Sequence, residues 1–296
     1  KEKSLRSDPE CGVLDPRFPE VREYLTGLYE RVVREWDLDG LKLDFIDSFH
    51  VGSDDRAIAE NYAGRDIHSL PEAVDVLLSG IIRRLREIKP EIMIEFRQSY
   101  IGPAIRKFGN IFRAADCAFD MLQNRVRTLD LRLLSGNTAV HSDMLIWSKE
   151  ETPEVAALQI LNVIFSTPQI SCMLTELPSS HLRMLAFWMS FCMRHRKTLQ
   201  ESKLRPEHPE HSYPVVTAES AEETITALYE TDRVVRLNAS HRHIVLNATH
   251  APELLIETPR PRKCVVFNTF GEEVLRCEVS GLARVAVPAS GFAEFE

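Results

Sequence analysis

Long apolar runs are missing from this sequence. No stretch approaches the roughly 18 consecutive apolar residues that a membrane-spanning helix needs, and the opening segment KEKSLRSDPE does not resemble a signal peptide. Long runs of Lys and Arg are missing too, and the net charge is −8, which disfavours polyanionic partners. We therefore expect neither a membrane nor a nucleic acid as a partner.

Cysteines at metal-ligand spacing are a second absence. Because the cysteines are scattered along a long chain without a CxxC pair, we expect reduced, mostly buried thiols rather than a disulfide framework. The pattern favours a reducing compartment such as the cytoplasm, and we expect no metal and no other cofactor. The six cysteines are Cys11, Cys117, Cys172, Cys192, Cys264 and Cys277.

The composition is that of an ordinary globular protein. Of the 296 residues, 44% are apolar and 27% are charged, which is enough apolar content for a large core. Segments with the helical spacing of apolar residues alternate with short apolar runs, which implies right-handed crossovers and a parallel sheet. We expect helices at residues 19–36, 69–85, 121–134, 153–165 and 180–195, and strands at 41–46, 91–96, 110–116, 138–143 and 168–174.

The pattern changes beyond about Tyr213. The remaining residues form short runs that are rich in β-branched side chains and separated by Asn, Asp, Gly and Pro, which predicts a separate all-β unit, a small sandwich. The segment QESKLRPEHPEHSYP, residues 200–214, has the prolines and charges of a linker. We therefore expect two domains, an α/β domain at residues 1–200 and a β-sandwich at 213–296.

Acidic residues recur at the carboxyl ends of successive expected strands. They are Asp44, Glu95, Asp116 and Asp143, and this edge is where active sites form in (β/α)8 barrels and in open doubly wound sheets alike. No GxGxxG or GxxxxGK turn follows any of the strands, which disfavours the nucleotide-binding versions of the open sheet. The recurrence predicts a site built from carboxylates.

The segment GLKLDFIDSF, residues 40–49, is the most informative of these strand ends. Side chains alternate along a strand, so Lys42 and Asp44 point to the same face. Two carboxylates across a cleft can cleave a glycosidic bond, and Asp44 and Asp116 would suit those roles. Lys42 would hold Asp44 ionised, and Arg113 could place or tune Asp116. Residue types alone leave other uses open.

Several further residues have two interpretations. His141 and Asp143 form an HxD pair that could bind a metal, but no third ligand is nearby in sequence, so we favour hydrogen bonding at the rim of the site. Trp147 is either a platform for a sugar ring or part of the core. Cys117 fits packing better than nucleophilic catalysis, and Asp47 fits a loop cap. Glu95 is either a ligand contact or half of an ion pair with its neighbour Arg97.

The segment LKLDF resembles the KxD nucleophile motif of the α-galactosidase clan, and the closest resemblance is to bacterial members of glycoside hydrolase family 36. The segments IEFRQ, FRAADC and AVHSDMLIW follow in the order of that family's later strands. The resemblance implies a (β/α)8 TIM-type barrel with a terminal β-sandwich, and retaining hydrolysis of terminal α-galactosides without a metal. By this resemblance Asp44 is the nucleophile, Asp116 the acid/base, Lys42 and Arg113 contact the sugar, and Glu95 binds a hydroxyl or supports a ligand.

The sequence departs from the family pattern in two places. Ala114 and Ala115 precede Asp116, and Cys117 follows it, where the family has a tryptophan and a serine near its aspartate. The family's first three strands have no counterpart in these residues, so we expect an amino-terminal part of the same polypeptide, or a second copy, to complete the barrel. The residues around Asp116 leave open a catalytically silent carbohydrate-binding relative. The missing strands leave the sugar undetermined, so an α-glycosidase for another small carbohydrate is a further alternative.

Overall fold

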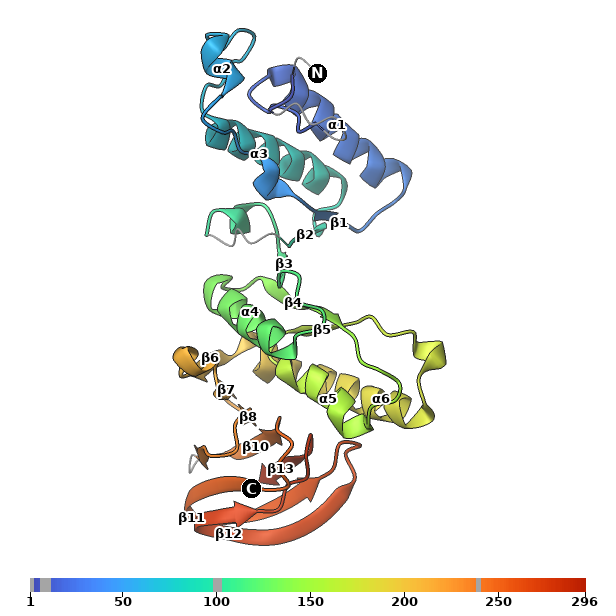
Figure 1. Ribbon diagram of the computed structural model, residues 1–296, viewed down its shortest axis with the longest axis vertical. Coiled ribbons are helices and arrows are strands. Elements are labelled where there is room, and N and C mark those ends of the chain that lie inside the picture. Colours follow the sequence, from blue (N-terminus) through green and yellow to red (C-terminus); the bar gives the residue numbers. More distant parts are fainter. Residues whose placement is uncertain (1–2, 6–11, 98–102, 238–240) are drawn as a thin grey trace. The chain divides into compact units, whose positions relative to one another are not determined.

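The computed structural model describes residues 3–5, 12–97, 103–237 and 241–296 (Figure 1). The chain forms two compact units, Lys1–Arg113 and Ala114–Glu296, called the amino-terminal and the carboxyl-terminal unit. Cys11, and Gln98 of the segment IEFRQ, lie outside the described residues. No helix within the described ranges combines the length and the apolar character needed to cross a membrane.

The amino-terminal unit alternates helices with parallel strands. Strand β1 pairs with β2, and β2 pairs with β3, all in parallel, as a sequence of right-handed crossovers requires. Three short helical turns lie in the connections. The elements are α1 (Pro19–Glu35), β1 (Gly40–Leu43), η1 (Ile46–Ser48), α2 (Arg56–Ala59), α3 (Leu70–Ile88), β2 (Met93–Phe96), η2 (Ile105–Lys107) and β3 (Ile111–Arg113).

Helices α1 and α3 confirm the two amphipathic patterns expected at residues 19–36 and 69–85. Pro19 opens α1 at its first turn, and the Ser69 hydroxyl caps α3 by accepting the Glu72 N–H at 3.4 Å. The two helices pack against each other, and the apolar face of α3 is buried along its length. Its buried residues are Leu70, Ala73, Leu77, Leu78, Ile81, Ile82 and Leu85.

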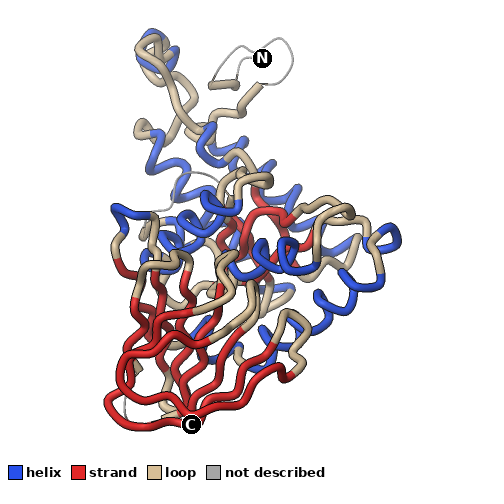
Figure 2. The backbone as a smooth tube through the Cα atoms, turned by 60° about the horizontal axis from the view of Figure 1, so that its bottom comes forward, coloured by secondary structure: helices blue, strands red, loops and turns tan. Residues whose placement is uncertain are grey.

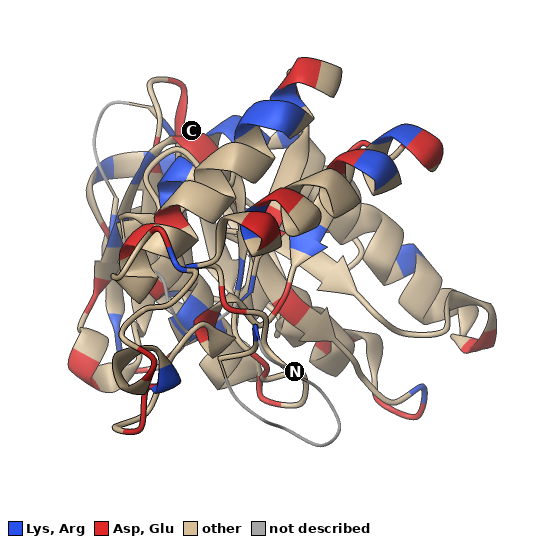
Figure 3. Cartoon of the chain, turned by 90° about the horizontal axis from the view of Figure 1, so that it is seen from above, with Lys and Arg blue, Asp and Glu red and all other residues tan. Residues whose placement is uncertain are grey.

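The first half of the carboxyl-terminal unit continues the α/β pattern. Strands β4 and β5 are parallel, and α4 packs on β4 while α5 packs on both α4 and α6. Lys/Arg and Asp/Glu positions are interspersed along the helices of the chain (Figure 3). The elements of this half are α4 (Met121–Leu134), β4 (Ala139–Leu145), α5 (Pro153–Asn162), β5 (Thr167–Ile170), η3 (Leu174–Glu176), α6 (Ser179–Arg194) and the π-helical turn η4 (Lys197–Glu201).

The second half of this unit is the all-β part, drawn as the group of red strands near the C-terminus in Figure 2. Its strands run in the order β12-β11-β13-β10-β8-β7-β6, and β9 pairs with β11. The elements are β6 (Lys203–Glu207), η5 (Pro209–His211), β7 (Val215–Glu219), β8 (Glu223–Leu228), β9 (Val234–Arg236), β10 (Arg242–Asn247), β11 (Leu254–Phe267), β12 (Glu273–Val285) and β13 (Phe292–Phe295).

Both faces of the central strands of this sheet are buried. On one face, Ile225 of β8 and Ile244 of β10 share a core with Trp188 and Phe191 of α6. On the other face, Val245 packs with residues of β9, β11 and β12, because the sheet curls over on itself. The alternation of side chains along a strand therefore divides the apolar residues between two cores.

The strands end earlier, and begin in other places, than the sequence patterns indicate. Strand β1 stops at Leu43 rather than at Ile46, because Phe45 adopts a left-handed conformation with φ 55°. The expected linker at residues 200–214 contains strand β6, which pairs with β7. Strand β6 tolerates Pro206 because it lies at the edge of the sheet, where one row of backbone groups needs no strand partner.

Candidate active site

Two neighbouring charge pairs join β1 to β2 in the amino-terminal unit. Lys42 and Glu95 are register partners, and the Lys42 Nζ lies 3.0 Å from the Glu95 Oε1. One step further along both strands, the Arg97 Nη1 lies 3.2 Å from the Asp44 Oδ2. Lys42 and Asp44 thus present their charges from the same face, as their spacing predicts, and each has an opposite charge, supplied by Glu95 of β2 and by Arg97 just beyond it.

The Asp44 carboxylate is held by contacts on both of its oxygens. Its Oδ1 accepts the backbone N–H of Phe45 at 2.9 Å, while Arg97 approaches Oδ2. The Arg97 guanidinium also lies 6.0 Å from the centre of the Phe45 ring, within the range of a cation–π contact. The left-handed Phe45 follows Asp44 directly and ends the extended course of β1.

Arg97 is a residue of this site whose contact with Asp44 the sequence analysis did not predict. The Asp44 side chain retains 35% of its accessible surface and that of Arg97 26%, so both are reachable from solvent. The signal was present in the sequence: Arg97 follows Glu95 by two residues at the end of β2, as Asp44 follows Lys42 at the end of β1. Only the parallel register, which places Leu43 opposite Phe96, makes Arg97 the residue that faces Asp44.

A cavity of about 470 Å³ lies beside the residues that follow Asp44. Turn η1 lines it with Asp47, and the lining is otherwise mostly apolar. Lys107 of η2 makes an ion pair of 2.7 Å with Asp75 of α3, which links two of the walls. The lining residues are Ile46, Asp47, Phe49, Pro71, Val74, Asp75, Leu78, Ala104, Ile105 and Phe108.

Asp143 organises the corresponding loop in the carboxyl-terminal unit. Its Oδ2 accepts the backbone N–H of Cys117, and Asn124 of α4 contacts its main chain twice, accepting the Asp143 N–H at 3.0 Å and donating to the Asp143 carbonyl at 3.2 Å. Asp143 is completely buried and lies inside β4, two residues before its end. The expectation that it sits on the rim at a strand end is therefore wrong; it anchors the loop that carries Asp116.

Asp116 lies in the loop beyond β3 and is exposed. Its carbonyl accepts a hydrogen bond of 2.7 Å from Arg127 Nη1 of α4. The next residue, Cys117, is half-buried. Its burial, as the main cause, and the negative charge of Asp143, as the second, raise the pKa of the Cys117 thiol to about 11. A protonated thiol at neutral pH is a poor nucleophile, which agrees with a packing role for Cys117.

The remaining predicted residues lie on or beside strands. Arg113 is the last residue of β3 and is 4% exposed. His141 lies in β4, opposite Thr167 of β5, and its carbonyl accepts the Ala114 N–H at 3.0 Å. Their positions agree with the strand assignments, and the roles given to them remain predictions.

Trp147 is held by a hydrogen-bonded histidine. Its Nε1 donates to the His181 Nδ1 at 3.1 Å, and the His181 Nε2 lies 2.9 Å from the Glu151 carbonyl. Because the indole can only donate, the imidazole must accept at Nδ1 and donate from Nε2, which fixes its neutral tautomer. Trp147 also packs against the apolar core. Its ring is therefore held in place by the core and by His181, whichever of its two predicted roles it has.

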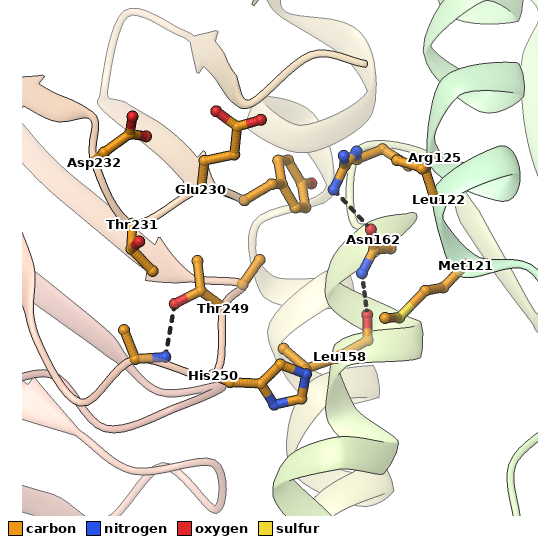
Figure 4. A pocket seen from close by; sticks show the side chains of 13 residues that line it. Met121, Leu122, Arg125, Leu158, Asn162, Glu230, Thr231, Asp232, Thr249 and His250 are labelled. Atoms are coloured by element: carbon orange, nitrogen blue, oxygen red, sulfur yellow. Dashed lines mark hydrogen bonds between the residues drawn. The ribbon is translucent and has the colours of Figure 1, made fainter. Parts of the chain in front are cut away.

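A second cavity, of about 590 Å³, lies within the carboxyl-terminal unit, between α4, α5 and the loops that follow β8 and β10. Figure 4 shows Arg125 in its wall, where it donates to the Asn162 Oδ1 at 2.9 Å. The Arg125 guanidinium stacks 4.1 Å from the centre of the Tyr229 ring. None of the residues predicted for the active site is among those that line this cavity.

No metal centre is formed by the part of the chain that the structure describes: it contains no group of three or more His, Cys, Asp or Glu side chains placed to hold an ion. His141 and Asp143, the HxD pair, are accordingly not joined by further ligands within the described residues. The Asp143 carboxylate instead binds a backbone N–H.

No protein-family model and no curated protein matches the chain, but solved structures resemble it. A β-L-arabinopyranosidase of glycoside hydrolase family 27 from Geobacillus stearothermophilus is 13% identical with a TM-score of 0.55, over 96% of this chain and 63% of that one. An α-amylase from Geobacillus thermoleovorans is 12% identical with a TM-score of 0.59, over 96% and 66%. An α-galactosidase of family 36 from G. stearothermophilus is 13% identical with a TM-score of 0.54, over 96% and 39%.

These similarities establish the fold class. The chain belongs to the α/β class and has the later strands of a (β/α)8 TIM-type barrel, followed by an all-β domain. It spans 63% and 66% of the length of the first two structures and 39% of the third. By their printed names, two of these proteins belong to glycoside hydrolase families, 27 and 36, and the third is an α-amylase.

Proposed function

We propose that this chain carries the catalytic residues of a retaining glycoside hydrolase that acts on terminal α-galactosides. The observation that supports it most is the Asp44 carboxylate just beyond β1, oriented by the Phe45 N–H and by Arg97, with the Lys42–Glu95 pair one step behind it. A carboxylate fixed at the carboxyl end of a barrel strand is where this fold places catalytic groups. The glycosidase names of the similar structures support the same class.

The proposed reaction is a double displacement. Asp44 attacks the anomeric carbon while Asp116 donates a proton to the leaving oxygen, and a water that Asp116 deprotonates then releases the sugar. This chemistry requires the two carboxyl groups to be about 5 to 5.5 Å apart in the assembled enzyme. Asp116 is the exposed member of the pair, and the buried Asp143 holds the N–H of its neighbour Cys117, which would keep the acid/base loop in place.

Other residues would recognise the sugar. Lys42 keeps 40% of its side-chain surface accessible while it contacts Glu95, so the two can share a sugar hydroxyl between an ammonium donor and a carboxylate acceptor. We assign Arg113, His141 and Trp147 to the same surface by their strand positions and by the family resemblance. Asp143 supports the loop rather than the substrate.

The first test replaces the two carboxylates one at a time. In the longest natural polypeptide that contains this chain, we expect Asp44→Ala and Asp116→Ala each to lower kcat for an aryl α-galactoside by about 10³-fold or more. Azide should restore turnover to Asp44→Ala and yield a β-galactosyl azide, because the small anion fills the space of the nucleophile. Asp47→Ala is the matched control: it removes an exposed carboxylate three residues away and should leave kcat within about two-fold.

Turnover like that of the wild type in Asp44→Ala would overturn the assignment of the nucleophile. A 2-fluoro galactosyl donor supplies an independent result, since it should accumulate as a covalent adduct whose mass maps to the peptide that contains Asp44. Turnover of a panel of aryl glycosides shows whether the preferred substrate is an α-galactoside or another α-glycoside. The proposed mechanism is the same in both cases.

A catalytically silent carbohydrate-binding protein is the second candidate. Ala114 and Ala115 before Asp116, and Cys117 after it, favour it, because they stand where the resembled family has a tryptophan and a serine. Calorimetry and a turnover assay on one sample distinguish the two: binding of galactose without turnover of any aryl glycoside supports the silent protein.

We also propose that residues 1–200 and 213–296 are separate domains and that an amino-terminal part, or a second copy, completes the barrel. This chain spans 39% of the length of the family 36 structure. An active, stable monomer of 33.8 kDa in native mass measurement would contradict this proposal.

A further inference from the structure

Two of the scattered cysteines are opposite each other in the folded chain. Cys264 of β11 and Cys277 of β12 are register partners in an antiparallel pair of strands. They lie in the middle of an unbroken run of pairs, from Arg262 opposite Val279 to Val266 opposite Leu275, with register shifts only outside this run. The pairing of the two cysteines is therefore fixed by regular strand geometry.

The spacing of such partners suits a disulfide, with some strain. Directly opposite residues in antiparallel strands have Cα atoms about 4.5 to 5.5 Å apart, within the range of about 4.4 to 6.8 Å that disulfides span. Their Cβ atoms are about 4.5 to 5.5 Å apart, slightly more than the bond prefers, so the strands must approach a little. A bond formed in this way is more easily reduced than a relaxed structural disulfide.

The two thiols differ in accessibility. Cys264 is completely buried, whereas Cys277 is half-buried on β12, the edge strand of the sheet. Burial, the neighbouring Cys277 thiol and a hydrogen bond with it raise the pKa of Cys264 to about 12. A small oxidant in solution therefore meets Cys277 first, and Cys264 lies directly opposite Cys277 on the neighbouring strand.

We propose that Cys264 and Cys277 form a redox-responsive dithiol, which a low-molecular-weight disulfide oxidises to a cross-strand disulfide. The Cys277 thiolate attacks one sulfur of the small disulfide, forms a mixed disulfide and releases one thiolate. Cys264 then gives up its proton and attacks the Cys277 sulfur, which releases the second thiolate. Two protein thiols are oxidised by two electrons, and one small disulfide is reduced to two thiols.

The bond would close a loop whose tip contacts helix α6. The loop runs over residues 265–276, and its turn packs on α6: the Trp188 Nε1 donates to the Thr269 Oγ1 at 3.4 Å, and Arg183 makes an ion pair of 3.1 Å with Glu272. Oxidation would therefore restrain the base of one of the segments through which the β-sheet contacts helix α6.

Gly271 shows how closely that turn approaches α6. It has φ 74°, and a Cβ added to it would lie 2.1 Å from a ring atom of Phe187. If the turn moved away from α6, it would lose this contact. We therefore expect that restraining the base of the turn also reduces the motion of the turn against α6. This coupling makes the oxidation state of the dithiol measurable away from the sulfur atoms.

The test incubates the natural polypeptide under native conditions with excess oxidised glutathione, followed by alkylation of the remaining thiols and trypsin digestion without a reductant. Trypsin cuts after Lys263, Arg276 and Arg284, so Cys264 and Cys277 fall in the separate peptides 264–276 and 277–284. We expect these two peptides to be recovered joined, and to separate after treatment with a reductant.

Stability and hydrogen exchange provide the second readout. Closing this loop should raise the Tm of the oxidised protein by about 5 to 10 °C and should slow amide exchange at residues 268–272. Cys264→Ser and Cys277→Ser should each abolish the joined peptide and the rise in Tm. Cys172→Ser is the matched control, because it removes another half-buried thiol and should leave both intact.

Two results would overturn the proposal. One is alkylation of both Cys264 and Cys277 after the incubation; the other is a stable mixed disulfide of glutathione on Cys277 with Cys264 still alkylated. If the serine variants fail to fold, the peptides from the wild-type protein decide the question by themselves.

Discussion

Single asparagine side chains form hydrogen bonds with the backbone at two places in the α/β part of the chain. Asn124 binds both the N–H and the carbonyl of Asp143. In the amino-terminal unit, Asn110 accepts the Ile94 N–H at 2.8 Å and donates to the Ile92 carbonyl at 3.1 Å. A side-chain amide offers one donor and one acceptor in the geometry of a peptide group, so it satisfies backbone groups that would otherwise be unpaired.

Replacement of Asp143 tests its role as an anchor. Asp143→Leu leaves the Cys117 N–H without its acceptor, and we expect it to lower the free energy of unfolding by about 1 to 3 kcal/mol. Asp143→Asn keeps a side-chain oxygen for that N–H and should cost less. Urea denaturation followed by circular dichroism measures both. Equal losses in the two variants would show that the hydrogen bond to Cys117 is not what Asp143 contributes.

At the scale of elements, helix α6 is the centre of an aromatic cluster. Trp188 is completely buried, and its ring centre lies 5.3 Å from that of Phe191 and 6.1 Å from that of Phe292. Phe191 comes from the same helix and Phe292 from β13, so the cluster joins α6 to the sheet. Edge-to-face contacts of this kind add to the burial of apolar area.

We expect Trp188→Ala to lower the free energy of unfolding by about 3 to 5 kcal/mol, because it leaves a cavity between α6 and the sheet. Met193→Ala is the control on the same helix: Met193 is 70% exposed, so the change should stay within about 0.5 kcal/mol. Urea denaturation monitored by circular dichroism avoids the loss of the fluorescent Trp188. A loss below about 1 kcal/mol for Trp188→Ala would mean that α6 is not packed on the sheet as described.

Helices were more predictable than strand ends. The N-caps Ser69 and Thr152, each accepting an N–H three residues on, follow from local sequence because a cap needs only neighbouring residues. The end of β1 depends on Phe45, whose left-handed conformation no sequence rule for phenylalanine predicts. Strand β6 lies in the segment expected to be a linker, since prolines and charges are also tolerated at a sheet edge.

At the scale of the whole molecule, the acid side of the stability curve depends on a buried histidine of the β-sheet. His243 is 3% exposed, and burial, with the nearby charges of Arg262 and His241, lowers its pKa to about 3. An unfolded histidine titrates near about 6.5. Between these two pH values the unfolded chain binds a proton that the folded chain does not, so stability falls as the pH is lowered from about 6.5 towards 3.

Replacing His243 should flatten that dependence. In His243→Gln the free energy of unfolding should decline less between pH 6.5 and 4 than in the wild type, by about 1 kcal/mol per pH unit. His250→Gln, at an exposed histidine of the same unit, is the control and should keep the slope of the wild type. Urea denaturation at a series of pH values measures both, and parallel curves for His243→Gln and the wild type would contradict the prediction.

The sequence by itself determined the local features: the helices and their caps, the alternation that placed Lys42 and Asp44 on one face, the parallel α/β class and the change to β-structure late in the chain. These depend on periodicity and on contacts between near neighbours. The tertiary structure alone decided which distant residues meet. Strand register placed Arg97 on Asp44 and Cys264 opposite Cys277, and burial made Asp143 an anchor. Such pairings follow from how strands align, and that alignment is set by the whole core rather than by any local pattern.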